Sequence, residues 1–164
     1  MRILGPNCLG LIDTSTPVNL SFTAGMPRSG AIAFMSQSGA LCTSILDIAL
    51  AQQVGFSRFV SLGNKADLNE IDFLRAWRDD PESAVIMAYL EGITDGERFL
   101  QVAREVTRKK PLIAVKSGTT SAGAQAVSSH TGSLAGSDRA YEAAFKQAGV
   151  IRAKSMEHLF DYAR

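Results

Sequence analysis

The sequence predicts an α/β fold in which five parallel strands form one sheet with helices on both faces. Five short apolar runs recur along the chain, and each is followed by a segment whose apolar residues repeat with the period of a helix. This alternation is typical of a parallel sheet, because parallel neighbours are joined by crossover connections that are usually helical. The runs are almost continuously apolar, which indicates strands that are buried on both faces.

The first strand and helix are expected after residue 29. Residues 30–36, G-A-I-A-F-M-S, form an apolar run bounded by glycine and serine, which predicts a buried strand. Residues 38–55 then carry apolar side chains at helical spacing, and Gly55 is the expected end of that helix.

The same alternation continues along the rest of the chain. The further expected strands span residues 56–63, 84–91, 111–117 and 150–153, and the helices that follow them span 68–80, 95–109, 137–148 and 156–163. Because right-handed crossovers leave few topologies, the expected arrangement is a doubly wound, flavodoxin-like parallel sheet of five strands.

We expect residues 1–164 to form a single domain whose core lies in residues 31–164. Residues 1–30 are expected to be a leading segment and a connection. Residues 11–30 are rich in Thr, Pro, Ser and Gly, which favours an irregular surface segment. Both ends look cut, because the chain starts on an apolar stretch and its last helical pattern has no cap. The expectation is therefore one domain of a longer multidomain chain.

The composition argues against several classes of protein. The chain is 46% hydrophobic and 20% charged with a net charge of +1, so it lacks the basic excess typical of nucleic-acid or membrane-surface binding. No apolar run approaches the roughly 18 residues of a membrane-spanning helix, and the first residues lack a signal-peptide pattern. Cys8 and Cys42 show no metal-ligand spacing. These features predict a cytoplasmic protein with reduced thiols.

Polar residues follow four of the predicted strands. They are residues 36–39, residues 63–65, residues 91–92 and the loop that leads from residue 117 to His130. In a parallel sheet the carboxyl ends of the strands meet at one edge, where ligands of doubly wound folds bind. We therefore expect these four groups to share one edge.

Residues 36–39, S-Q-S-G, form a small polar turn between a strand and a helix. The backbone N–H groups of such a turn and of the helix that follows make an anion site. A serine in this position is equally well explained as a helix N-cap, and the two interpretations are compatible. The segment is neither a P-loop nor a dinucleotide fingerprint, because the chain contains no G-x-x-x-x-G-K-[ST] and no G-x-G-x-x-G.

His130 lies in a long run of Gly, Ser, Thr and Ala, between Ser128 and Ser129 on one side and Thr131, Gly132 and Ser133 on the other. A lone histidine is usually a surface or structural residue. Here a neutral imidazole at the edge of the sheet, surrounded by small residues, could attack phosphorus and become a phosphohistidine. His158, in the last amphipathic segment, is given no function.

Glu91 comes directly after a buried strand, where a carboxylate is poorly solvated and needs a partner. One alternative is an ion pair with a nearby Lys or Arg. The other is a hydrogen bond from one ring nitrogen of His130, which leaves the second nitrogen free as the nucleophile.

Gly63 and Asn64 could supply further donors to an anion or a carboxylate, but a turn in which Asp67 or Asn69 caps the next helix is the simpler explanation. One histidine at the edge, without a recognisable pair of carboxylates, argues against a metal site.

Five ordered motifs resemble one family. G-P-N-C-L-G, S-Q-S-G-A-L, S-L-G-N-K-A-D-L-N-E-I-D-F-L, Y-L-E-G-I and S-S-H-T-G-S-L-A-G-S-D are together similar to the ligase domain of NDP-forming acyl-CoA synthetases, the superfamily of ADP-forming acetyl-CoA synthetase and succinyl-CoA synthetase. The resemblance covers essentially the whole chain. It implies a flavodoxin-like domain that carries a transiently phosphorylated histidine.

The resemblance also implies roles for individual residues. His130 would be the nucleophile and Glu91 its orienting carboxylate. The phosphoryl group would be held by Ser36, Gln37, Ser38, Gly39, Ser129, Thr131 and Gly132. Substrate would be bound with the help of Asn7, Gly63 and Asn64.

The family reaction converts acyl-CoA, phosphate and ADP into acid, CoA and ATP through an acyl phosphate and a phosphohistidine. It implies coenzyme A, ADP or ATP, and Mg²⁺ in the complete protein, with none bound tightly to this domain alone. It also implies two partners, a CoA-binding Rossmann domain and a nucleotide-binding ATP-grasp domain, in the same chain or a partner subunit. The isolated domain is expected to be inactive, and the acyl group and the oligomeric state, including a dimer, are left open.

A different class of protein is the alternative. Some multidomain protein lysine acetyltransferases carry a similar synthetase-like region that senses acyl-CoA, and such relatives often lack the histidine. The presence of His130 favours the enzyme. An FMN-binding flavodoxin fits poorly, because no aromatic pair is placed to sandwich a flavin ring.

Overall fold

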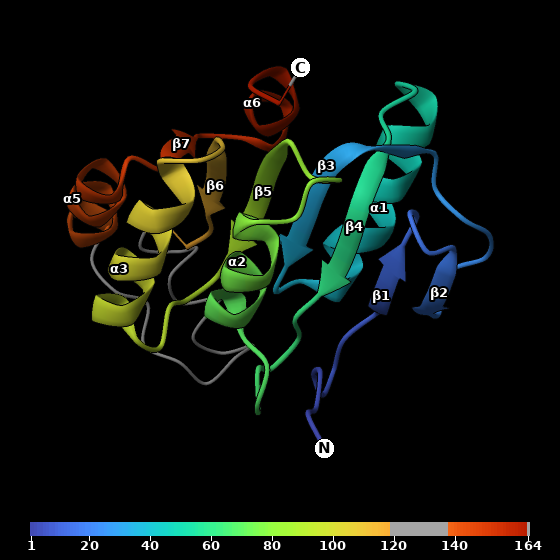
Figure 1. Ribbon diagram of the computed structural model, residues 1–164, viewed down its shortest axis with the longest axis horizontal. Helices are drawn as coiled ribbons and strands as arrows, with labels where there is room; N and C mark the ends of the chain where they lie inside the picture. The colour runs from blue at the N-terminus through green and yellow to red at the C-terminus, as the bar shows by residue number, and fades with distance from the viewer. Residues whose placement is uncertain (119–137, 164) are drawn as a thin grey trace.

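A seven-stranded mixed sheet forms the centre of the domain in the computed structural model, which describes residues 1–118 and 138–163 (Figure 1). The strand order is β2-β1-β4-β3-β5-β6-β7. The strands are β1 (Gly10–Asp13), β2 (Val18–Ser21), β3 (Ser29–Ser36), β4 (Phe56–Ser61), β5 (Val85–Leu90), β6 (Leu112–Lys116) and β7 (Ile151–Ala153).

Five neighbouring strands of this order, β4, β3, β5, β6 and β7, pair in parallel. Helices alternate with them along the chain. The helices are α1 (Gly39–Ala51), α2 (Glu70–Arg78), α3 (Gly96–Thr107), α5 (Asp138–Ala148) and α6 (Met156–Asp161). Counted along the chain, the parallel strands have the spatial order 2-1-3-4-5, which is the flavodoxin-like order. The predicted fold class is confirmed.

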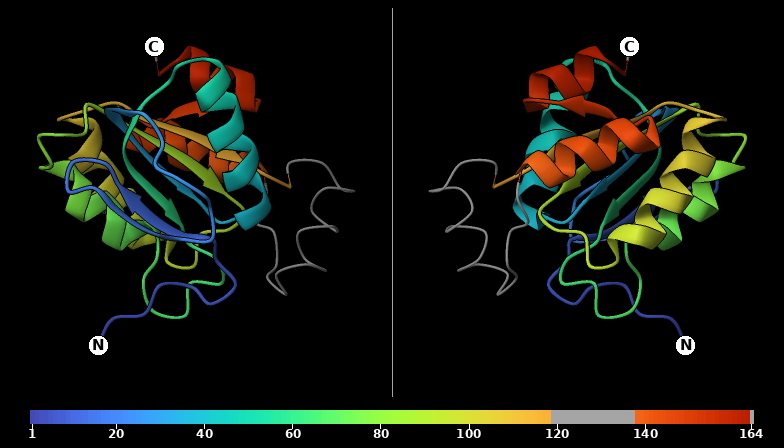
Figure 2. Two further views of the ribbon diagram at one scale, coloured as in Figure 1. Left: turned by 90° about the vertical axis from the view of Figure 1, so that its right-hand side faces the viewer. Right: turned by 90° about the vertical axis from the view of Figure 1, so that its left-hand side faces the viewer.

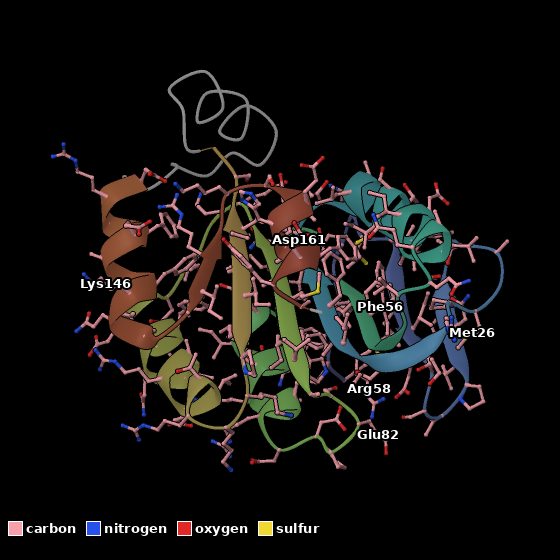
Figure 3. All side chains as sticks on the ribbon, turned by 90° about the horizontal axis from the view of Figure 1, so that it is seen from above. Met26, Phe56, Arg58, Glu82, Lys146 and Asp161 are labelled. Atoms are coloured by element: carbon pink, nitrogen blue, oxygen red, sulfur yellow. The ribbon has the colours of Figure 1, made fainter. Side chains whose placement is uncertain are left out.

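The two faces of the sheet are covered by different helices (Figure 2). Helices α2, α3 and α5 pack on one face, and α1 and α6 pack on the other. Strand residues alternate between the two cores as the pleat requires. In β3, for example, Met35 packs with the first group of helices and Phe34 with the second. Seen from above, side chains fill the layers on both sides of the sheet, and Phe56 lies within one of them (Figure 3).

The expectation that residues 11–30 form an irregular connection is wrong. Part of this segment folds into the antiparallel pair β1–β2, and β1 also pairs antiparallel with β4, so the sheet is extended by two strands. Both strands have only four residues, and Ile12 is their one fully buried side chain, at 1% exposure. The outer strand instead exposes Val18 and Leu20. Four residues are too few for the alternation of apolar and polar residues in β2 to be distinguished from a loop.

Gly55 does not end α1, as the sequence pattern predicts. The helix ends at Ala51, and Gln53 takes the left-handed conformation, with φ of 57°, that terminates it. Gly55 instead lies against the backbone of Ser29 and Gly30 at the start of β3. A Cβ atom on Gly55 would be 2.2 Å from the carbonyl oxygen of Ser29, and one on Gly30 would be 2.4 Å from that of Gly55.

Within the described part of the chain, every helix is too short or too polar to cross a bilayer.

Candidate active site

The carboxyl ends of β3, β4, β5 and β6 lie at one edge of the sheet (Figure 1). The parallel register sets Ser36 beside Ser61 on one side and beside Tyr89 on the other. It likewise sets Leu90 beside Lys116. The residues that follow these strands are therefore close neighbours, as the order of strands and helices predicts.

The turn after β3 is built by its two serines. Ser36 is fully buried, and its Oγ accepts the N–H of Ser38 at 3.0 Å and donates to the carbonyl of Ser38 at 2.9 Å. Ser38 is the N-cap of α1, with its Oγ accepting the N–H of Leu41. This cap aims the amino end of α1 at the edge of the sheet. The first N–H groups of the helix, on Gly39 and Ala40, have no intrahelical acceptor and carry the positive end of the helix dipole.

Gln37 turns its side chain away from this helix end. Its Oε1 accepts the N–H groups of Glu91 and Gly92, the latter at 2.9 Å, and its Nε2 donates to the carbonyl of Gly92 at 2.8 Å. The residue is only 8% exposed. The side chains of Ser36 and Gln37 are thus both engaged within the protein, and the expected contact of this turn with phosphate stays a prediction. The backbone N–H groups left for an anion in this turn are those of Gly39 and Ala40, because that of Ser38 donates to Oγ of Ser36.

Glu91 is half-buried, directly after β5. Its carboxylate forms no ion pair with any Lys or Arg in residues 1–118 and 138–163, so the simpler of the two sequence-based alternatives is not observed there. The negative charge of Glu91 raises the pKa of two neighbours, Tyr89 and Lys116. Burial raises the pKa of Tyr89, and the charge of Glu91 raises it further, although a hydrogen bond with Ser117 lowers it. Ser129, His130, Thr131 and Gly132 lie outside the described residues, so the bond between His130 and Glu91 stays a prediction.

Two lysines complete this edge, and neither was assigned a role from the sequence. Lys65, after β4, donates to the carbonyl of Gly92 at 2.8 Å and to Oε2 of Glu70 at 3.0 Å. Glu70 is 1% exposed, and its buried negative charge is compensated by the positive charge of Lys65. The sequence alone does not reveal this contact, because Gly92 is distant from Lys65 in the chain.

Lys116 ends β6 and is 5% exposed. Its Nζ donates to the carbonyl of Ser117 and lies 4.7 Å from the centre of the Tyr141 ring. Burial lowers the pKa of Lys116, while the charges of Asp138 and Glu91 raise it and that of Arg152 lowers it. A lysine that closes an otherwise apolar run was the available sequence signal for this residue.

Asn7, Gly63 and Asn64 lie close together, and their expected role in substrate binding stays a prediction. The N-terminal segment runs beside the loop after β4, with hydrogen bonds from Asn64 N to Pro6 O at 2.9 Å and from Ala66 N to Gly5 O at 2.9 Å. Asn7 Nδ2 donates to Asn64 Oδ1 at 3.3 Å. Gly63 has φ of 59°, and a Cβ atom there would lie 2.2 Å from Pro6 O, so only glycine fits.

Asn69, one of the two predicted caps of the next helix, is the N-cap of α2. Its side chain accepts the N–H of Ile71, and Asp72 completes a capping box. Asp67 is not a cap. Its carboxylate pairs with Arg2 at 2.9 Å and accepts the N–H of Ile3 at 2.8 Å, which fastens the N-terminal segment to this loop.

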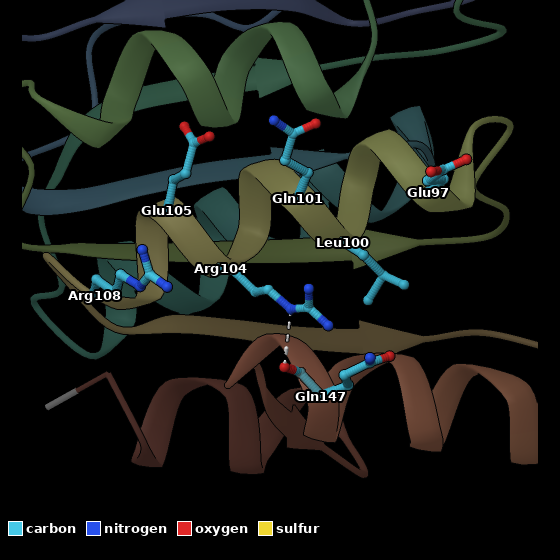
Figure 4. Close-up of a pocket in the computed structure, with 7 residues that line it drawn as sticks. All are labelled: Glu97, Leu100, Gln101, Arg104, Glu105, Arg108 and Gln147. Carbon is cyan, nitrogen blue, oxygen red and sulfur yellow. Dashed lines mark hydrogen bonds between the residues drawn. The ribbon is translucent and has the colours of Figure 1, made fainter.

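A shallow groove of about 520 Å³ lies elsewhere, along α3 and the end of α5 (Figure 4). Its lining carries both signs of charge, and Arg104 Nε donates to the carbonyl of Gln147 at 3.3 Å. It is lined by residues of α3, Arg108 and Gln147, and none of the candidate site residues takes part in it, so it is not the candidate site. The described residues also contain no group of three or more His, Cys, Asp or Glu side chains that could hold a metal ion.

Comparison with known proteins points to one family. A family model described as the succinyl-CoA ligase like flavodoxin domain matches residues 29–164. ADP-forming acetate–CoA ligase I of Archaeoglobus fulgidus is 51% identical over 163 residues, which are 99% of this chain and 24% of that protein. The alpha subunit of ADP-forming acetate–CoA ligase I of Pyrococcus furiosus is 47% identical over 164 residues, which are 100% of this chain and 36% of that protein.

A solved structure agrees with these relatives. The dinucleotide forming acetyl-coenzyme A synthetase 1 of Ca. Korarchaeum cryptofilum, in complex with phosphate and ADP, matches with a TM-score of 0.95 at 46% identity. The match covers 99% of this chain and 35% of that chain. The chain therefore spans about a quarter to a third of the length of the proteins it resembles.

Proposed function

Because the chain belongs to the family of succinyl-CoA ligase like flavodoxin domains, we propose that it is the phosphohistidine-carrying domain of an ADP-forming acyl-CoA ligase. The observation that supports this most is the likeness, at 46% identity, to a synthetase solved with phosphate and ADP. The amino end of α1 and the carboxylate of Glu91 at one edge of the sheet agree with that chemistry.

The proposed reaction has three steps. A phosphate oxygen attacks the carbonyl carbon of the acyl-CoA thioester, the C–S bond breaks, and CoA leaves as the thiolate. The ring nitrogen of His130 then attacks phosphorus of the acyl phosphate, the P–O bond breaks, and the carboxylate leaves. An oxygen of the ADP β-phosphate finally attacks the phosphohistidine, the P–N bond breaks, and ATP and neutral His130 are formed.

The described residues contribute to the second and third steps. Glu91 would accept a hydrogen bond from the other ring nitrogen of His130 and stabilise the charge that forms on the ring. Backbone N–H groups of Gly39 and Ala40 would bind the phosphoryl oxygens, because transfer of this group depends mainly on positioning and on stabilising negative charge.

The remaining components belong to partners. We propose that CoA is bound by a Rossmann domain and ADP by an ATP-grasp domain, in the same chain or in a partner subunit. The name of the Pyrococcus furiosus relative, an alpha subunit, supports at least the existence of a further subunit in that protein. Mg²⁺ would be held by the phosphates of ADP and by the partner domain, since carboxylate clusters suited to it are absent from the described part of this chain.

The experiment is phosphoryl labelling of the full-length protein. Incubation with radiolabelled ATP and Mg²⁺ is expected to give an acid-labile, base-stable label that disappears in His130→Ala. His158→Ala is the matched control, because His158 is the other histidine of this sequence and lies on α6. Absence of any label from the wild-type protein would contradict the proposal and favour an acyl-CoA-sensing region of the kind that is fused to lysine acetyltransferases.

A further inference from the structure

Gln37 joins two neighbouring strand ends of the sheet. It follows β3, and its backbone N–H donates to the carbonyl of Tyr89 in β5 at 3.1 Å, which continues the pairing of the two strands by one residue. Its side chain then crosses to the loop between β5 and α3. A single buried residue thus connects the turn before α1 to the loop that carries Glu91.

The bonds made by this side chain fix the backbone on both sides of Glu91. The N–H of Glu91 belongs to the peptide group before its Cα, and the N–H of Gly92 belongs to the peptide group after it. Both N–H groups donate to the same oxygen, Oε1 of Gln37. Because the orientation of the two flanking peptide planes defines φ and ψ, this oxygen determines where the Cα–Cβ bond of Glu91 points.

Further bonds hold the same loop in place. The carbonyl of Leu90 accepts the N–H of Ser117 at 2.9 Å, which fixes the other side of the peptide group before Glu91. The carbonyl of Gly92 accepts both Nε2 of Gln37 and Nζ of Lys65, each at 2.8 Å. If the side-chain amide of Gln37 moved away, several backbone groups of Glu91 and Gly92 would lose a hydrogen-bond partner. The observed conformation of the loop is therefore strongly preferred.

From these contacts we infer that Gln37 is a positioning residue, which orients the carboxylate of Glu91 rather than binding phosphate. The inference rests on the proposed function, in which Glu91 holds the ring of the nucleophile. It assigns Gln37 an effect that is transmitted entirely through Glu91. A misplacement of a catalytic group by about 1 Å can cost roughly a hundredfold in rate, so the effect is measurable.

The test is a double-mutant cycle in the full-length protein with its partner subunit or domains. Formation of the phosphohistidine is followed in a single turnover by rapid quench for the wild type, Gln37→Met, Glu91→Gln and the double variant. Methionine keeps the volume of glutamine and removes its hydrogen bonds. We expect each single variant to slow labelling roughly tenfold to a hundredfold, with the KM for nucleotide unchanged. The double variant should be no slower than Glu91→Gln alone.

Each outcome decides a separate question. If Gln37→Met slows labelling by the same factor in the Glu91→Gln background as in the wild type, the two residues act independently and the inference is overturned. If Glu91→Gln labels at the wild-type rate, the proposed role of Glu91 is wrong, whatever Gln37 does. Gln101→Met, on the exposed surface of α3, is the matched control and should label normally.

A second variant keeps the test decisive should Gln37→Met fail to fold. Gln37→Glu retains an oxygen that accepts the N–H groups of Glu91 and Gly92, but it replaces the donor to the carbonyl of Gly92 with an oxygen that repels it and adds a buried negative charge. We expect a loss of rate, which again vanishes in the Glu91→Gln background. A loss that persists there would overturn the inference as well.

Discussion

Lys116 lies over the ring of Tyr141, with its Nζ 4.7 Å from the ring centre, where the carboxyl end of β6 meets α5. The ring offers a buried ammonium group part of the stabilisation that water would give it. The hydroxyl of Tyr141 accepts the N–H of Ile93 at 3.1 Å, so the same side chain also supports the loop after β5. Lys116 and Tyr141 together therefore link β6, α5 and the segment that carries Glu91.

We predict that the free energy of unfolding changes less with pH in the alkaline range for Lys116→Met than for the wild type. Burial lowers the pKa of Lys116 below its ordinary value of 10.5, so between these two values the unfolded chain binds a proton that the folded chain does not. The free energy of unfolding should therefore increase as the pH rises through this interval. The difference between variant and wild type is measured by denaturant unfolding at several pH values from 7 to 10. Lys146→Met, on the exposed face of α5, should keep the wild-type slope; equal slopes for Lys116→Met and the wild type would show the prediction to be wrong.

Tyr141→Phe should lower the free energy of unfolding by about 1 kcal/mol, because it keeps the ring under Lys116 and removes the acceptor for the N–H of Ile93. Chemical denaturation measures the change. Tyr162→Phe provides the comparison, since Tyr162 is exposed beyond the end of α6, and its replacement should alter stability by much less. Equal effects of the two substitutions would contradict the assigned hydrogen bond.

Gly63→Ala should destabilise the protein by about 2–4 kcal/mol, which combines the strain of a side chain at positive φ with a clash against Pro6 O. The cost falls on the contact between the N-terminal segment and the loop after β4. Gly96→Ala is the control: a Cβ atom there meets nothing within 4 Å, and it starts α3, where alanine is tolerated. Thermal unfolding of both variants checks the prediction, and a Gly63→Ala protein as stable as the Gly96→Ala protein would disprove it.

The two cysteines should differ sharply in reactivity. Burial raises the pKa of the Cys42 thiol to about 11, against smaller opposing effects of hydrogen bonds with Ser61 and Ser36. At pH 8 only about one Cys42 thiol in a thousand is then the reactive thiolate. Cys8 is half-buried and should be alkylated by iodoacetamide first, as peptide mass spectrometry would show. Cys8→Ser should remove the fast phase and Cys42→Ser should keep it; a fast phase that survives Cys8→Ser would refute the assignment.

Local sequence patterns predicted the parallel core of this fold because the strands from β3 to β7 are mostly apolar and are separated by helical patterns. The pair β1–β2 escaped prediction because its strands have only four residues each and lie among Thr, Pro, Ser and Gly residues that favour turns. Gly55 was misread because glycine marks both helix ends and close contacts between backbones. Only the three-dimensional arrangement distinguishes the two.

The location of the candidate site was predictable from the sequence, but the contacts within it were not. The order of strands and helices places residues 36–39, 63–65 and 91–92 at one edge, because parallel strands end on the same side. The function of Gln37 was not predictable, since its partners Glu91 and Gly92 lie on another strand end and are contacted only in the folded chain. Lys116 was overlooked for the same reason, because Tyr141, over whose ring it lies, belongs to α5.

The backbone contact between Gly30 and Gly55 limits how this domain can be varied by mutagenesis. At each position the obstacle to a side chain is main chain, at 2.2–2.4 Å from the Cβ atom that would be added. No change of a neighbouring residue can therefore make room, in contrast to a clash between two side chains, which a smaller partner relieves. Randomised libraries and chimaeras should keep both glycines invariant as a unit and place their diversity elsewhere.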